Sequence, residues 1–129
     1  MHRQPLDFPE MMSSDPDSTA AELTFADLQI HPSVLQAVGD VGYEKPSAIQ
    51  AAIIPAMIAG SDVVGLAQTG TGKTAAFAIP ILSKIDPANK STQALVLAPT
   101  RELALQVAEA FGRYGSHLPA IKVLPIYGG

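Results

Sequence analysis

The residues best suited to chemistry lie in one glycine-rich stretch of the chain. Residues 66–77 read LAQTGTGKTAAF and include Gly70, Gly72, Lys73 and Thr74. Glycines at such a bend let successive backbone N–H groups converge on one anion. A lysine at this place attracts the β- and γ-phosphates of a nucleotide, and the hydroxyl that follows is suited to bind Mg²⁺. The stretch therefore predicts a site for a nucleoside triphosphate.

The pattern A-x-x-x-x-G-K-T begins at Ala67, where the general phosphate-binding motif has glycine. The alternative interpretation is a glycine-rich turn that contains Lys-Thr by chance. An apolar run before the loop and a helical pattern after it favour the phosphate site. The nucleotide-binding candidates from the loop are Ala67, Gln68, Thr69, Gly70, Thr71, Gly72, Lys73 and Thr74. Among them, Lys73 and Thr74 are the catalytic candidates, and Thr74 is the candidate Mg²⁺ ligand.

A second candidate site lies upstream in the stretch GYEKPSAIQ, residues 42–50. Ser47-x-x-Gln50 matches a helix capping box, in which Gln50 reaches back to the Ser47 N–H. Alternatively, the Gln50 amide pairs with N6 and N7 of adenine, the match that glutamine makes to this base in DNA. The residues alone leave both interpretations open.

The elements that would position these residues alternate between strands and helices. Short apolar runs predict buried strands at 63–66, 94–98 and 121–126. Helical spacing predicts a short helix from His31-Pro32 that stops at Gly39, a longer helix between its N-cap Ser47 and Gly60, and helices at 73–85 and 101–114. This alternation predicts an α/β fold with a parallel, doubly wound sheet flanked by helices.

Composition narrows the class of protein. The 129 residues suffice for one domain, and a hydrophobic content of 47% argues for globular packing. Residues 1–22 are rich in proline, serine and acidic residues, so we expect a disordered acidic tail.

A formal charge of −4 argues against bulk electrostatic binding of nucleic acid, so any such contact would be local. The lack of cysteine suits a cytoplasmic location, and no apolar run is long enough to span a membrane.

Five segments together resemble the opening motifs of the DEAD-box ATP-dependent RNA helicases. They are Phe25, residues 42–50, residues 67–74, the sequence PTRELA at 99–104 and the pair Gly128-Gly129. Phe25 precedes the second segment at the spacing of the aromatic residue in that family's adenine-reading Q motif. The resemblance implies that residues 23–129 form the N-terminal portion of a RecA-like ATP-binding domain with a P-loop.

The resemblance also implies roles for residues of the Q motif. Phe25 would pack against adenine, Lys45 would lie beside the base and ribose, and Gln50 would select adenine over guanine. Taken alone, Phe25 also fits a core aromatic residue and Lys45 a solvated turn lysine. The implied cofactors are ATP and Mg²⁺.

RNA is the implied partner, bound through its backbone without regard to sequence. The residues concerned are Pro99, Thr100, Arg101, Glu102, Gly128 and Gly129. The first four sit where a predicted strand leads into a helix, a place that favours anions. The alternative for Arg101 is a solvent-facing residue of the first helical turn.

The chain lacks two further motifs of the family, Asp-Glu-Ala-Asp and Ser-Ala-Thr. Hydrolysis needs acidic residues that hold Mg²⁺ and orient the attacking water, and the family keeps them in the first of these. We therefore expect the first part of a helicase, inactive alone, whose full-length parent couples ATP hydrolysis to RNA unwinding. The alternatives are a nucleotide- or RNA-binding module without turnover and another P-loop ATPase.

Overall fold

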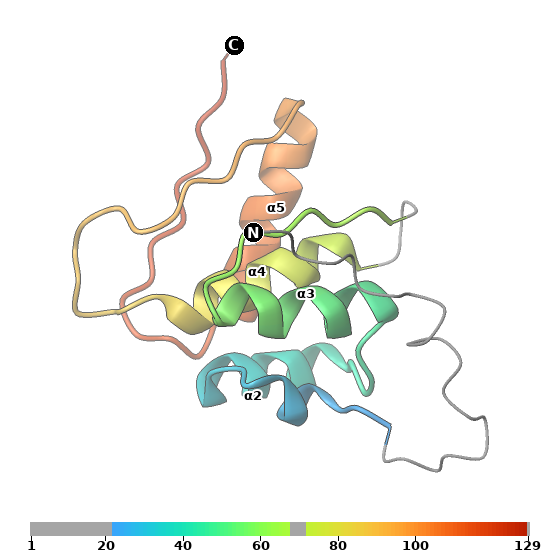
Figure 1. Ribbon diagram of the computed structural model, residues 1–129. Helices are drawn as coiled ribbons and strands as arrows, with labels where there is room; N and C mark the ends of the chain where they lie inside the picture. Colours follow the sequence, from blue (N-terminus) through green and yellow to red (C-terminus); the bar gives the residue numbers. More distant parts are fainter. Residues whose placement is uncertain (1–21, 68–71, 129) are drawn as a thin grey trace, which may run out of the picture.

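Five helical elements form the framework of the protein in a computed structural model that describes residues 22–67 and 72–128 (Figure 1). They are the 3₁₀ helix η1 (Phe25–Leu28) and the α-helices α2 (Pro32–Val41), α3 (Ala48–Ile58), α4 (Lys73–Lys84) and α5 (Arg101–Tyr114). The acidic tail expected over residues 1–22 lies outside the described residues, apart from Glu22. Within the described ranges, no helix has the length and apolar character needed to cross a membrane.

Side-chain caps set the starts of α3 and α5. Ser47 is the N-cap of α3 and accepts a hydrogen bond from the Gln50 N–H at 3.3 Å. Thr100 caps α5 in the same way, and its hydroxyl accepts from the Leu103 N–H at 3.1 Å. Each cap satisfies a backbone donor that the first helical turn leaves unpaired. The expected starts of both helices are therefore confirmed.

The first predicted helix is longer than expected. α2 does not stop at Gly39 but continues to Val41 and ends at Gly42, whose φ of 91° is left-handed. The Gly42 N–H donates to the Gly39 carbonyl at 3.0 Å and closes the helix end. A glycine inside a helix costs only about 1 kcal/mol relative to alanine, so Gly39 is tolerated. The left-handed backbone at Gly42 is what terminates the helix.

α4 lies at the centre of the helical layer. It packs against both α3 and α5, while α2 contacts α4 and α5 (Figure 1). Buried residues occupy most of its length, and Ala78, Ile79 and Leu82 are completely inaccessible. A helix that is apolar on most sides needs neighbours around it. The packing of α4 therefore fixes the end of the glycine loop that precedes it.

The structure does not show the predicted parallel sheet, because no described residue lies in a β-strand. The segments expected at 63–66, 94–98 and 121–126 are plain traces in Figure 1, and in the described ranges no backbone hydrogen bond joins them. An α-helix satisfies its own N–H and C=O groups, whereas a strand needs a ladder partner. Several residues predicted to be buried are exposed instead, with Leu95 81% and Leu97 85% accessible, whereas Val96 and Ile121 are partly buried against the core.

Candidate functional site

The glycine loop leads directly into α4. Gly72 is the N-cap and has a φ of 77°, a left-handed conformation that glycine adopts without strain. Lys73 is the first residue of the helix, and its Nζ donates to the Ala67 carbonyl at 2.8 Å. An ammonium group has three N–H donors, so this bond leaves two for phosphate oxygens. The other loop candidates, Gln68, Thr69, Gly70 and Thr71, lie outside the described residues.

Gln50 contacts the glycine loop. The residue is 4% exposed, and its Nε2 donates to the Gly72 carbonyl at 3.3 Å. A Cβ at position 72 would lie 2.4 Å from the same Nε2, so only glycine leaves room for this contact. The structure therefore brings together two candidates that stand 22 residues apart in the sequence.

The capping box at the start of α3 is present. Gln50 Oε1 accepts from the Ser47 N–H at 2.9 Å, while Ser47 Oγ accepts from the Gln50 N–H. A glutamine amide has two donor hydrogens and two acceptor lone pairs. The contacts with Ser47 and Gly72 use one donor and one acceptor and leave one of each. The capping interpretation is confirmed, and it is compatible with adenine recognition, which stays a prediction.

Phe25 is a core residue at one end of an aromatic stack. It is 3% exposed, and its ring centroid lies 6.1 Å from that of Tyr43. Tyr43 stacks in turn on Tyr114 at 6.3 Å, and the Tyr114 hydroxyl donates to the Tyr43 hydroxyl at 3.2 Å. Burial and this hydrogen bond raise the pKa of the Tyr114 phenol. The stack joins η1 and the end of α5 to the turn that carries Lys45.

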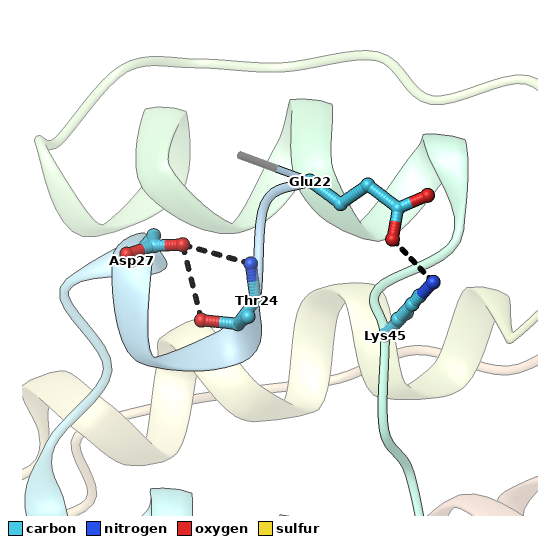
Figure 2. A network of polar contacts seen from close by, with 4 residues as sticks. All are labelled: Glu22, Thr24, Asp27 and Lys45. Carbon is cyan, nitrogen blue, oxygen red and sulfur yellow. Dashed lines mark hydrogen bonds and ion pairs between the residues drawn. The ribbon is translucent and has the colours of Figure 1, made fainter. Parts of the chain in front are cut away.

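Lys45 is exposed and forms an ion pair with Glu22. Figure 2 shows the two side chains pointing toward one another, one from the segment before η1 and one from the turn before α3. The hydrogen bond and the opposite charge lower the pKa of the Glu22 carboxyl and raise the pKa of Lys45. Nearby, Asp27 accepts from the Thr24 N–H at 2.8 Å and from its hydroxyl at 3.0 Å, and these bonds lower the pKa of Asp27. Lys45 is therefore a solvated turn residue with an acidic partner.

The residues around the start of α4 fit the phosphates of a nucleotide. The helix start offers N–H groups and the positive end of the helix dipole. Thr74 lies in the first turn and is partly buried. The described residues contain no group of three His, Cys, Asp or Glu that could hold a metal ion. Mg²⁺ bound at Thr74 would take its other ligands from phosphate oxygens, water and acidic groups outside the described residues.

The candidates for nucleic-acid contact meet at the start of α5. Residues 99–102 are all exposed. The guanidinium carbon of Arg101 lies 5.9 Å from the centroid of the Tyr127 ring, next to the exposed Gly128. Gly129 lies outside the described residues. The structure thus places two candidate segments that are far apart in the sequence beside one another.

Sequence reasoning missed the residues that hold these candidates in place. Glu22, Tyr114 and Tyr127 each contact a candidate residue or its turn, yet none of them belongs to a motif. The Glu22–Lys45 and Tyr43–Tyr114 contacts join residues 23 and 71 positions apart. Helix and turn patterns relate residues only a few positions apart, so they cannot predict these contacts. The only sequence signal for them was the charge or aromatic ring of each residue.

Comparison with known proteins identifies a family whose members resemble this chain in sequence. A model of the DEAD/DEAH box helicase family matches residues 47–129. The chain is 75% identical over 122 residues to a protein of Mycobacterium tuberculosis described as ATP-dependent RNA helicase DeaD. The match covers 95% of this chain and 21% of that protein. The chain therefore spans about a fifth of the length of the curated relatives it matches.

Solved structures of helicases have a similar arrangement of elements. The RNA-helicase Prp28 from Chaetomium thermophilum, bound to ADP, matches with a TM-score of 0.73 and 38% identity over 82% of this chain and 27% of that one. Dbp5 from S. cerevisiae, bound to RNA and ADP BeF3, matches with a TM-score of 0.70 and 35% identity over 73% of this chain and 25% of that one. Since the family match also covers more than half of the sequence, this chain belongs to the DEAD/DEAH box helicase family.

Proposed function

We propose that this chain is the N-terminal part of an ATP-dependent RNA helicase whose full-length parent couples ATP hydrolysis to the opening of RNA duplexes. Membership of the family supports this proposal, as does the description of the Mycobacterium tuberculosis relative as an ATP-dependent RNA helicase. The similar helicase structures contain ADP, and one of them contains RNA. The parts of the parent outside these residues would supply the acidic groups that hydrolysis requires.

The contact between Gln50 and Gly72 is the observation that carries the nucleotide site. A nucleotide presents its base at one end and its phosphates at the other. The groups that bind the two ends must therefore stay at a fixed distance and orientation from each other. The 3.3 Å bond from Gln50 Nε2 to the Gly72 carbonyl provides that relation. Gln50 would offer its remaining donor and acceptor to adenine N7 and N6.

The phosphates would lie against residues 67–74. Backbone N–H groups of the loop and of the α4 start would hold them, with Lys73 neutralising charge on the β- and γ-phosphates in the transition state. Thr74 would bind Mg²⁺, which supplies further neutralisation when present. Lys45 would break its ion pair with Glu22 and lie beside the base. Phe25 is buried against Tyr43, so it could pack directly on adenine only if the turn that carries Tyr43 shifted.

The extended segments would form the parallel sheet of a RecA-like domain in the full-length protein. A Cβ at Gly65 would lie 3.2 Å from the Ile49 side chain, so this side of the segment faces α3. The neighbouring Val64 and Leu66 are 88% and 90% exposed. Such alternation is typical of a strand. Strands and helices from elsewhere in the parent would pair with these segments and cover their exposed side.

RNA would bind at residues 99–102 and 128–129. The start of α5 offers backbone N–H groups, and Arg101 offers a guanidinium suited to phosphate. Contacts of this kind hold the RNA backbone and do not read the base sequence.

Competition between ATP and GTP tests the nucleotide site in the full-length protein. We expect GTP to fail as a competitor, and Gln50→Ala to weaken ATP binding by about 1–3 kcal/mol, the value of one bidentate base contact. Ser47→Ala is the matched control, because it removes the hydroxyl that caps the Gln50 N–H and keeps the Ser47 N–H that binds the Gln50 amide. It should lower stability by about 1 kcal/mol without changing the preference for ATP. Equal binding of ATP and GTP by the unmodified protein would count against the proposal.

A second candidate, nucleotide binding without turnover, applies to residues 1–129 alone. The sequence has no Asp-Glu-Ala-Asp motif, and the described residues contain no acidic cluster that could hold Mg²⁺ and orient water. RNA-stimulated ATP hydrolysis by purified residues 1–129 would refute this candidate.

A further inference from the structure

Two groups from different segments lie beside the guanidinium of Arg101. The Tyr127 ring lies on one side, with its centroid 5.9 Å from the guanidinium carbon. The Glu102 carboxylate lies 3.8 Å from Nε. The Arg101 side chain is 51% exposed and Tyr127 is 49% exposed, so a ligand can reach the pair from solvent.

This arrangement restrains a long side chain and leaves its phosphate-binding end open. A cation within about 6 Å of an aromatic centroid is attracted by the negative face of the ring. Glu102 approaches the single donor at Nε at 3.8 Å, so it does not use the four N–H donors on the two Nη atoms. These donors match the geometry of a phosphate group. Restraint before binding also reduces the entropy lost when a ligand immobilises the side chain.

We propose that Tyr127 is a positioning residue for RNA binding, which acts by holding the Arg101 guanidinium against its ring. The proposal rests on the RNA contact proposed for Arg101. It adds a residue that belongs to neither of the two candidate RNA segments. Tyr127 itself need not touch RNA, because its effect passes through Arg101.

A second pair of the same kind provides a matched control. The guanidinium carbon of Arg113 lies 5.9 Å from the centroid of the Tyr114 ring, at the opposite end of α5. No RNA-binding candidate lies in that part of the described structure. Arg113→Gln therefore removes a similar charge and a similar ring contact without touching the proposed RNA site.

The test is the affinity of the full-length protein for a fluorescent single-stranded RNA, measured over a range of KCl concentrations. We expect Tyr127→Leu to weaken binding about two- to fivefold, as for an exposed cation–π contact, and Tyr127→Phe to keep the affinity because the ring remains. Arg101→Gln should lower the slope of log affinity against log salt by about 0.7, one phosphate contact on a single strand. Tyr127→Leu should lower the slope too, although it removes no charge. Arg113→Gln should change neither quantity.

The variants separate failure of this inference from failure of the proposed function. Unchanged binding by Arg101→Gln would refute the proposed RNA contact of Arg101. It would also refute the role proposed for Tyr127, which depends on that contact. Weaker binding by Arg101→Gln with unchanged binding by Tyr127→Leu would contradict the positioning role alone. Further weakening by Tyr127→Leu in the Arg101→Gln background would mean that Tyr127 contacts RNA directly, which also overturns that role.

Phenylalanine analogues at position 127 with increasing fluorination decide the case if Tyr127→Leu also disturbs the fold. Their rings have nearly constant size, while fluorine withdraws the negative charge from the ring face. We expect the RNA affinity to fall stepwise with fluorination at constant ATP affinity. An RNA affinity independent of fluorination would overturn the proposal.

Discussion

Gln50 serves the fold and the proposed site with the same amide group. Its capping bonds to Ser47 follow a local pattern, so the sequence predicted them as one of two alternatives. The bond to Gly72 depends on the packing of α3 against α4 across 22 residues, and no local pattern contains it. For the same reason, the sequence placed Phe25 and Lys45 in the Q motif but did not reveal their partners Tyr43 and Glu22.

Gly72→Ala should damage both stability and ATP binding. A left-handed φ costs a residue with a Cβ about 1–2 kcal/mol, and the new Cβ would lie 2.4 Å from Gln50 Nε2. Urea unfolding and ATP titration of the full-length protein measure the two effects. Gly39→Ala is the control, because no atom lies within 4 Å of the new Cβ inside α2, and it should stabilise the protein by about 0.5–1 kcal/mol. Unchanged ATP affinity in Gly72→Ala would contradict the proposed loop geometry.

Tyr114 should make the protein less stable at high pH. Its folded pKa is raised by burial and by its hydrogen bond to Tyr43, so the folded state keeps the proton after the unfolded chain has lost it. The stability due to this group is present below the unfolded pKa of about 10 and is lost as pH rises above it. The slope approaches about 1.4 kcal/mol per pH unit for one proton. Thermal unfolding between pH 8 and 11 should show this fall, and Tyr114→Phe should reduce it.

At the scale of elements, the structure contains the predicted helices, whereas the predicted strands do not form among the described residues. The span of α5, Arg101–Tyr114, follows from the cap at Thr100 and from apolar spacing, and α4 ends one residue before the predicted Ile85. These signals are local because a helix forms its hydrogen bonds within itself. The apolar composition of residues 94–98 also predicted an element, but a strand depends on partners that local sequence does not specify. The described residues supply none for this segment.

Thr100→Ala should destabilise α5 by about 1 kcal/mol, because the Leu103 N–H would lose its acceptor. Thr100→Ser keeps an oxygen at the same place and should retain most of the stability. Chemical unfolding of the full-length protein compares the two variants. Equal loss in both would mean that the threonine methyl group matters more than the cap.

At the scale of the whole molecule, the helical layer has a packed core, whereas the extended segments present apolar side chains to solvent. The most exposed of these are Val64, Leu66, Leu95, Leu97, Leu124 and Ile126. Exposed apolar surface on this scale marks a contact face. The family match indicates the class of domain, whereas no described residue lies in a strand.

Residues 1–129 in isolation should self-associate through these exposed side chains. Leu97→Glu should reduce the association by placing a charge on the apolar side, as measured by sedimentation velocity. Gln106→Glu adds the same charge on the exposed side of α5 and should have little effect. Equal behaviour of the two variants would show that net charge, and not the apolar surface, controls association.

The most direct measurement is a crystal structure of the full-length parent with a non-hydrolysable ATP analogue and Mg²⁺. We expect adenine N6 and N7 within hydrogen-bond distance of the Gln50 amide, phosphates against Gly72 and Lys73, and the Thr74 hydroxyl on the metal. A base bound far from Gln50, or phosphates held away from the glycine loop, would contradict the proposed site.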